Sequence, residues 1–149
     1  MSDHILGKRN LVDTARTHSN QIDRERQKKT AEIFTPRHLI DDMLDRLPSE
    51  AWTDPSKTFL EPSCGDGNFL EAIHERLMVG LTIAIPDPVQ RHAWIIENMI
   101  YAIDLMPDNV EAAIDRINAR GLLHNIRCAD TLAADLHVLF SKEEPLFQW

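Results

Sequence analysis

The sequence predicts an α/β fold built around a parallel sheet, on three observations. Three short apolar segments, residues 58–61, 99–103 and 125–128, have the composition and length of strands. Segments with a helical spacing of apolar residues alternate with these strands. An acidic or small residue follows each strand, as is common at the ligand-binding edge of such sheets. Strands that alternate with helices pair in parallel through right-handed crossovers, so we expect a doubly wound sheet with flanking helices.

Length and composition fit a soluble protein with one main domain. The chain has 149 residues, of which 43% are hydrophobic and 27% are charged, and compact domains commonly contain about 100–150 residues. The two cysteines, Cys64 and Cys128, form neither a disulfide framework nor a metal-binding spacing. The first ten residues contain no apolar core of a signal peptide. We therefore expect a cytoplasmic protein with no membrane partner.

Charge divides the chain into a basic arm, residues 1–30, and a domain, residues 31–149. The arm contains seven Lys or Arg and four Asp or Glu, a net charge of +3. The domain contains nine basic and twenty acidic residues, and the whole chain carries a net charge of −8. An acidic surface repels a phosphate backbone. DNA binding would therefore need the arm, a missing part or a partner chain.

Residues 35–47 are expected to form the first amphipathic helix. Thr35 has the side chain of an N-cap, and Pro36 is favoured at the first helical position. Apolar residues recur at helical spacing on one face, and these are Leu39, Ile40, Met43, Leu44 and Leu47. We expect residues 48–57 to form a loop before the first strand.

Four more helices are expected between and after the strands. Asp87 and Pro88 have the residue types of an N-cap and a first helical residue. Gly121 stands where a glycine in the left-handed conformation would end a helix. The expected helices cover residues 68–78, 88–98 and 107–117, with a brief fourth helix ending near residue 140.

Acidic and small residues follow the three predicted strands at equivalent places. The turn Pro62–Gly67 follows the first strand, Asp104 ends the second, and Asp130 follows the third. Because the carboxyl ends of parallel strands share one edge of a sheet, these residues are expected to meet at one ligand site. Each alone also fits a structural role, with the glycines and Asp66 stabilising an ordinary turn and the other aspartates capping helices.

The chemistry of these residues indicates a class of ligand. The turn lacks the third glycine of a dinucleotide fingerprint, since Leu70 occupies that position, and Asp66 would repel a phosphate. A carboxylate suits a positive amino group, while the N–H groups at the start of the next helix suit a carboxylate. Asp104 suits a ribose diol, and Asp130 suits an exocyclic amino group. An amino acid, a ribose and an adenine together form S-adenosylmethionine.

Four stretches of the sequence resemble, in order, the first motifs of adenine-specific DNA methyltransferases. They are EIFTPRHLIDDML, FLEPSCGDGNFL, IYAIDLMPDNVE and CADTL, within about residues 28–135. The FTP motif precedes the glycine turn, which resembles the gamma arrangement of amino-methyltransferases. The resemblance implies the Rossmann-like class I fold of S-adenosylmethionine methyltransferases, with a partial parallel sheet and flanking helices.

The resemblance also implies how the matching residues bind S-adenosyl-L-methionine. Thr35 and Pro36 would line the methionine end of the cofactor, and Asp66 would lie nearest its amino group. Asp104 would hold the ribose, Leu105 or Met106 would pack on the adenine face, and Asp130 and Thr131 would meet the adenine edge. The implied cofactor-binding residues are Thr35, Pro36, Glu61, Pro62, Ser63, Cys64, Gly65, Asp66, Gly67, Asp104, Leu105, Met106, Asp130 and Thr131.

The motif that carries catalysis in this family is not found in the sequence. It consists of Asn, Asp or Ser, then Pro-Pro, then Tyr or Phe, and the 149 residues contain no adjacent prolines. No other catalytic constellation and no metal site is evident. Cys64 fits a small turn residue, and we expect solvated side chains for His38, His74, His92, His124 and His137. We therefore interpret the chain as the cofactor-binding part of a DNA adenine methyltransferase, inactive without a missing C-terminal part or partner.

This interpretation has one alternative, and it implies a partner. The alternative is a non-catalytic protein that binds S-adenosylmethionine or a partner chain after losing methyl transfer. In the family a fourth strand lies beside the first, so the edge of residues 58–61 is expected to be open. That edge would pair with a second copy, with a complementary subunit, or with Leu146–Trp149 folded back over it.

Overall fold

The computed structural model describes residues 35–141. In chain order these residues form α2 (Arg37–Leu44), α3 (Glu50–Thr53), β1 (Phe59–Glu61), α4 (Asn68–Gly80), α5 (Pro88–Trp94), the π-helix η1 (Ile95–Met99), β2 (Ile100–Asp104), α6 (Pro107–Arg116), β3 (Asn125–Cys128) and α7 (Leu136–Leu139). The expected basic arm and the segment Leu146–Trp149 lie outside the described residues. No helix of the described part is long and apolar enough to cross a membrane.

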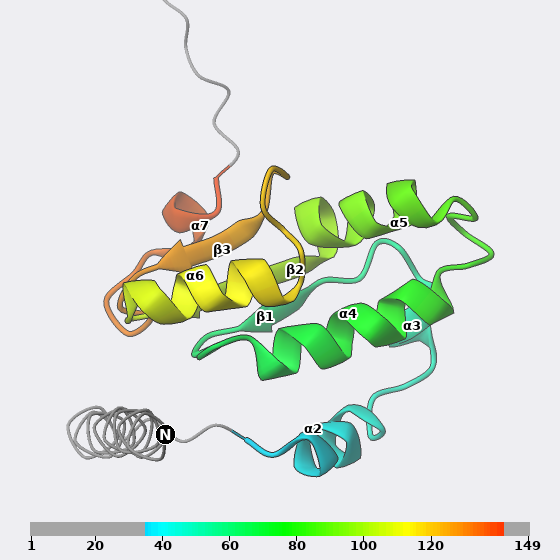
Figure 1. The fold of residues 1–149 in the computed structure, drawn as a ribbon, viewed down its shortest axis with the longest axis horizontal. Helices are drawn as coiled ribbons and strands as arrows, with labels where there is room; N and C mark the ends of the chain where they lie inside the picture. The colour runs from blue at the N-terminus through cyan, green and yellow to red at the C-terminus, as the bar shows by residue number, and fades with distance from the viewer. Residues whose placement is uncertain (1–34, 142–149) are drawn as a thin grey trace, which may run out of the picture. The chain divides into compact units, whose positions relative to one another are not determined.

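The three strands form one parallel sheet in the order β1-β2-β3. Leu60 of β1 lies opposite Tyr101 of β2, and Ala102 of β2 lies opposite Ile126 of β3. The helices α4 and α6 pack against each other and against β2 (Figure 1). This arrangement confirms the predicted α/β class, with a small parallel sheet and flanking helices, and it is compatible with a Rossmann-like fold.

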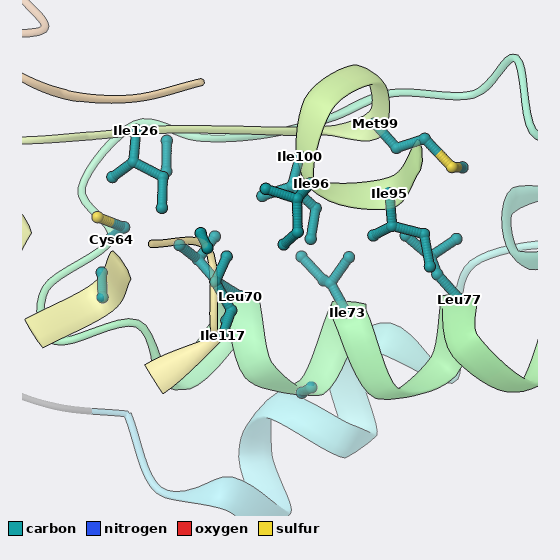
Figure 2. Packing of buried hydrophobic residues seen from close by; sticks show 14 of the residues in the cluster. Cys64, Leu70, Ile73, Leu77, Ile95, Ile96, Met99, Ile100, Ile117 and Ile126 are labelled. Carbon is teal, nitrogen blue, oxygen red and sulfur yellow. The ribbon is translucent and has the colours of Figure 1, made fainter. Parts of the chain in front are cut away.

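The hydrophobic core joins α4 to the sheet and to η1. Leu70, Ile73 and Leu77 recur at helical spacing on α4, and each is at most 5% exposed. Figure 2 shows Ile73 pointing toward the side chains of Ile96 and Ile100, and Leu77 toward that of Ile95. Each fully buried aliphatic side chain of this kind contributes about 1.5–3 kcal/mol. This burial fixes the direction of α4, and therefore the position of the loop that precedes it.

The start of α2 differs from the sequence prediction. The cap residue is Pro36, with an extended backbone at ψ 144°, and the helix begins at Arg37 without a side-chain cap from Thr35. The carbonyl of Pro36 accepts the first backbone hydrogen bonds of the helix, from Leu39 and Ile40. The capping prediction was therefore wrong by one residue. The helix also ends at Leu44 and not at residue 47, and its apolar face is narrower than expected, because Leu39 and Met43 are exposed while Ile40 and Leu44 are buried.

The segment expected to be a loop before β1 contains the short helix α3. Its Trp52 stacks on Phe59 of β1, with ring centroids 5.2 Å apart and an interplanar angle of 16°. Gly80 at the end of α4 lies directly against Trp52, since a Cβ at residue 80 would overlap the Trp52 carbonyl. A four-residue helix is too short to give a periodic sequence signal. The prediction of a loop over residues 48–57 was wrong for this reason at Glu50–Thr53.

Two helix ends also differ from the prediction. The helix expected to run to residue 98 changes to the π-helix η1, which buries Ile95, Ile96 and Met99. After α6, Asn118 takes the left-handed conformation at φ 53°, and its N–H donates to the Asp115 carbonyl at 3.2 Å. The Ala119 N–H donates to the Ile114 carbonyl at 2.9 Å, which completes a Schellman motif. Gly121 is therefore not the capping residue.

Candidate functional site

Hydrogen bonds tie together the loops that follow β1, β2 and β3. The hydroxyl of Thr131, after β3, donates to the carbonyl of Pro62, after β1, at 2.6 Å. The N–H of Gly65 donates to the Asp104 carboxylate at the end of β2, at 2.9 Å. The N–H of Ala129 donates to the Asp104 carbonyl at 3.0 Å. The residues singled out at the three strand ends therefore meet at one edge of the sheet.

The loop after β1 turns tightly because of its glycines. Gly65 has φ 53° and Gly67 has φ 93°, in the region that favours glycine. The loop also lies close to α6, because a Cβ at Gly67 would lie 2.9 Å from the Cα of Ala113. The Cys64 N–H donates to the Ile103 carbonyl of β2 at 2.9 Å, which fixes the start of the turn. The loop is thus held by both β2 and α6.

Cys64 is a packing residue of this loop. It is 6% exposed, and burial, followed by the nearby charges of Asp104 and Glu61, raises the pKa of its thiol to about 12. A thiol with this pKa remains protonated at neutral pH and is a poor nucleophile. Burial also raises the pKa of Glu61, against the lowering effect of the Ser63 N–H that donates to its Oε1 at 3.2 Å.

Asp104 is buried and organises the centre of the site. Its Oδ2 accepts from Gly65, while its Oδ1 accepts from the Met106 N–H at 2.9 Å and from the Asn109 amide at 3.1 Å. The residue is 7% exposed. A carboxylate offers about four acceptor positions, so the protein already occupies most of them. A ligand hydroxyl would share this carboxylate with the loop that Asp104 supports.

Asp66 pairs with an arginine that the sequence did not suggest. Its Oδ2 lies 2.6 Å from Nη2 of Arg116, and its backbone carbonyl accepts from the Arg116 Nε at 2.8 Å. The Arg116 Nη1 lies 3.3 Å from Oε2 of Glu71, in the first turn of α4. Arg116 is the last residue of α6, fifty positions from Asp66 in the sequence. No local pattern in the sequence indicates a pairing over that separation.

The remaining candidate residues lie around the same edge or at the start of α2. Asp130 is exposed, and its Oδ1 accepts from the Leu132 N–H at 3.0 Å. Leu105 is 65% exposed, whereas Met106 is half-buried. Thr35 is half-buried and Pro36 exposed at the beginning of α2, a helix that packs against α4.

Two of the histidines form a contact that contradicts the expectation of solvated side chains. The His74 Nε2 on α4 lies 2.8 Å from the His92 Nδ1 on α5. The His92 Nε2 lies 3.2 Å from the Asn118 carbonyl, so this ring nitrogen carries the proton and donates. Burial, and then the charge of His92, lower the pKa of His74 to about 4. This pair therefore connects α4, α5 and the turn after α6. Within residues 35–141, no three His, Cys, Asp or Glu side chains form a group that could hold a metal ion.

Comparison with known proteins relates the chain to methyltransferases. Over 77 residues, 50% of this chain, it is 38% identical to an uncharacterized adenine-specific methylase of Mycoplasma pneumoniae. The matched region covers 18% of that protein, so the chain spans a small part of the length of its relative. No protein-family model matches the chain. The match supports a methyltransferase relationship, and a methyltransferase relationship suggests a cofactor of the S-adenosylmethionine type.

Proposed function

We propose that residues 31–149 are the S-adenosylmethionine-binding part of an adenine-specific DNA methyltransferase of the gamma arrangement. The observation that carries this proposal is the meeting of three strand-end loops, joined by the Thr131–Pro62 and Gly65–Asp104 hydrogen bonds. In open parallel sheets, ligands bind at this edge. The match to an adenine-specific methylase supports the choice of cofactor and of substrate class.

The cofactor would extend along the three loops in the order of its parts. Its amino-acid part would lie at Pro62–Gly67, where the N–H groups at the start of α4 favour a carboxylate. Its ribose would approach Asp104, and its adenine would lie between the side chains that follow β2 and those that follow β3. When bound, S-adenosylmethionine supplies the methyl group that is transferred. The residues of this chain would hold and orient it.

Transfer of the methyl group to DNA would require residues outside this sequence. The Pro-Pro-aromatic motif of the family is missing from the 149 residues, whose net charge of −8 opposes binding to a phosphate backbone. We therefore propose that methyl transfer depends on a further segment or on a partner chain. The same observation, the missing motif, favours the alternative of a degenerate relative that binds the cofactor without catalysis.

The free edge of β1 is a further place where we propose a contact, and here the contact comes from this chain itself. Within the described sheet, β1 pairs with β2 alone. A hollow of about 290 Å³ lies between β1, β2 and α7, and it is lined by Thr58, Phe59, Leu60, Tyr101, Leu136 and Phe140. The ring of Phe140 meets that of Tyr101 at 5.1 Å, so α7 ends beside the hollow. We propose that Leu146–Trp149, which follow α7 closely, cover this edge.

Calorimetric titration with S-adenosylhomocysteine, the demethylated product, tests cofactor binding directly. The wild-type chain should release or absorb heat on binding, and Asp104→Asn should weaken the affinity because the ribose contact loses its charge. Asp115→Asn is the matched control, since Asp115 lies on the exposed side of α6 and pairs with Arg120. Thermal melts establish that both variants are folded at the titration temperature. The proposal fails if the wild-type chain shows no binding at millimolar ligand.

A further inference from the structure

Arg116 reaches from the end of α6 to the glycine loop, Pro62–Gly67, and to the first turn of α4, and it makes three contacts. Its Nε donates to the Asp66 carbonyl at 2.8 Å, and its Nη2 lies 2.6 Å from Oδ2 of the same residue. Its Nη1 lies 3.3 Å from Oε2 of Glu71. A planar guanidinium can hold a backbone oxygen and a carboxylate oxygen together, which a lysine ammonium cannot do in the same geometry.

These contacts commit one carboxylate oxygen of Asp66 to the protein. Its Oδ2 is taken by Arg116, and its Oδ1 is buried and has no hydrogen-bond partner within residues 35–141. We infer that Arg116 is a positioning residue for cofactor binding, and that Asp66 serves the site by holding Arg116 and the loop in place. This inference rests on the proposed function, because it concerns the same ligand site.

The loop needs such a fixing contact because two of its residues are glycines with positive φ. Glycines lose more conformational freedom than other residues when a loop is ordered. Gly67 already lies against Ala113, one turn before Arg116 on α6, and the Arg116 Cδ would lie 3.5 Å from a Cβ at Gly67. The ion pair also joins the C-terminal end of α6 to the N-terminal end of α4, where the helix dipoles favour a cation and an anion respectively.

The alternative, in which Asp66 binds the ligand's amino group directly, makes the opposite prediction. If Asp66 were the ligand's partner, Arg116 would compete for it, and removing Arg116 would strengthen binding. If Arg116 positions the loop, its removal weakens the binding of the ligand's amino-acid part. The sign of the change in affinity on Arg116→Gln therefore separates the two roles.

The test compares two ligands in calorimetric titrations of the full chain. S-adenosylhomocysteine carries the amino-acid part, and 5′-methylthioadenosine lacks it. Arg116→Gln should lower the affinity for S-adenosylhomocysteine about tenfold or more, which is the effect of losing hydrogen bonds to a charged group. It should lower the affinity for 5′-methylthioadenosine much less. Arg116→Lys should recover only part of the loss. The double variant Asp66→Asn/Arg116→Gln should bind S-adenosylhomocysteine no more weakly than the weaker of the two single variants. The reason is that both substitutions break the same contact, the Asp66–Arg116 ion pair.

Arg120→Gln is the matched control for the loss of an arginine in this region. Arg120 pairs with Glu111 and Asp115, is 61% exposed, and has no contact with the glycine loop among the described residues. Its replacement should leave both affinities unchanged. Unchanged or tighter binding of S-adenosylhomocysteine by Arg116→Gln would overturn the inference. Equal losses for both ligands, in step with a lower melting temperature, would also overturn it, since they indicate a structural role alone.

Hydrogen exchange decides the inference even if the proposed function fails. A wild-type chain that binds neither ligand refutes the proposed function, but the effect of Arg116 on the loop is still measurable without ligand. The N–H groups of Gly65 and Gly67 are hydrogen-bonded, to Asp104 and to the Cys64 carbonyl. They should exchange faster in Arg116→Gln than in Arg120→Gln. Equal exchange rates in the two variants would refute the positioning role.

Discussion

Replacing Gly67 by alanine should destabilise the protein more than the same change at Gly121. Both glycines have positive φ, 93° and 87° respectively, so both substitutions force an L side chain into a backbone conformation that costs about 1–2 kcal/mol. At Gly67 the new Cβ would also lie 2.9 Å from the Cα and 3.1 Å from the Cβ of Ala113. Crowding of this kind in a packed region costs about 1–3 kcal/mol.

The contact at Ala113 can therefore be isolated by subtraction. A Cβ at Gly121 would meet nothing within 4 Å, so Gly121→Ala measures the backbone term alone. We expect losses in the free energy of unfolding of about 2–5 kcal/mol for Gly67→Ala and about 1–2 kcal/mol for Gly121→Ala. Urea unfolding, followed by circular dichroism, gives both values. Equal losses would refute the argument, because they would show that the loop can move away from α6 at little cost.

Four further results are expected. The free energy of unfolding should fall as the pH drops from about 6.5 toward about 4, because His74 takes up a proton at higher pH in the unfolded chain than in the folded one. His74→Gln should flatten this pH dependence in urea titrations. An unchanged pH dependence would show that other groups cause it. Iodoacetamide should alkylate the exposed Cys128 of the native protein, whereas the buried Cys64 should react only after urea unfolds the protein. Rapid labelling of both cysteines in the native protein, read by mass spectrometry, would contradict the burial of Cys64. Deleting residues 146–149 should increase self-association, measured by sedimentation velocity, because the edge of β1 loses its proposed cover. If the shortened chain associates no more than the full chain, these residues do not cover the edge. The purified chain should bind cofactor and yet transfer no labelled methyl to duplex DNA containing adenine, and any transfer that depends on bound cofactor would reveal a catalytic group that the sequence does not suggest.

The strands and the longer helices could be predicted because their sequences carry strong local signals. Residues 125–128 form a strand with the expected bounds, and the apolar spacing in α4 matches its buried face. The cap of α5 was also predicted correctly, since the Asp87 carboxylate accepts from the Gln90 N–H at 2.8 Å. Such features depend on residues close together in the sequence. Features that depend on tertiary contacts, such as α3 with its Trp52 stacking, were missed.

The positions of the candidate site could be predicted, but the partners of its side chains could not. The loops after three parallel strands must meet at one edge, whatever their detailed contacts. Whether a carboxylate there faces a ligand or the protein depends on groups that are distant in sequence. Arg116 and Asp66 are fifty residues apart, and neither has a neighbouring residue that indicates the pairing. The Arg116 contact bears most directly on the role expected of Asp66.

The Thr131–Pro62 hydrogen bond has a consequence for how a ligand could enter between the loops. The bond joins residues 69 positions apart and lies at the exposed surface. A neutral hydrogen bond of this kind contributes a net of about 0.5–1.5 kcal/mol. Breaking this one bond would therefore cost little, while the Gly65–Asp104 and Ala129–Asp104 hydrogen bonds would still hold each loop to the end of β2. The edge of the sheet can therefore be both ordered in the free protein and accessible.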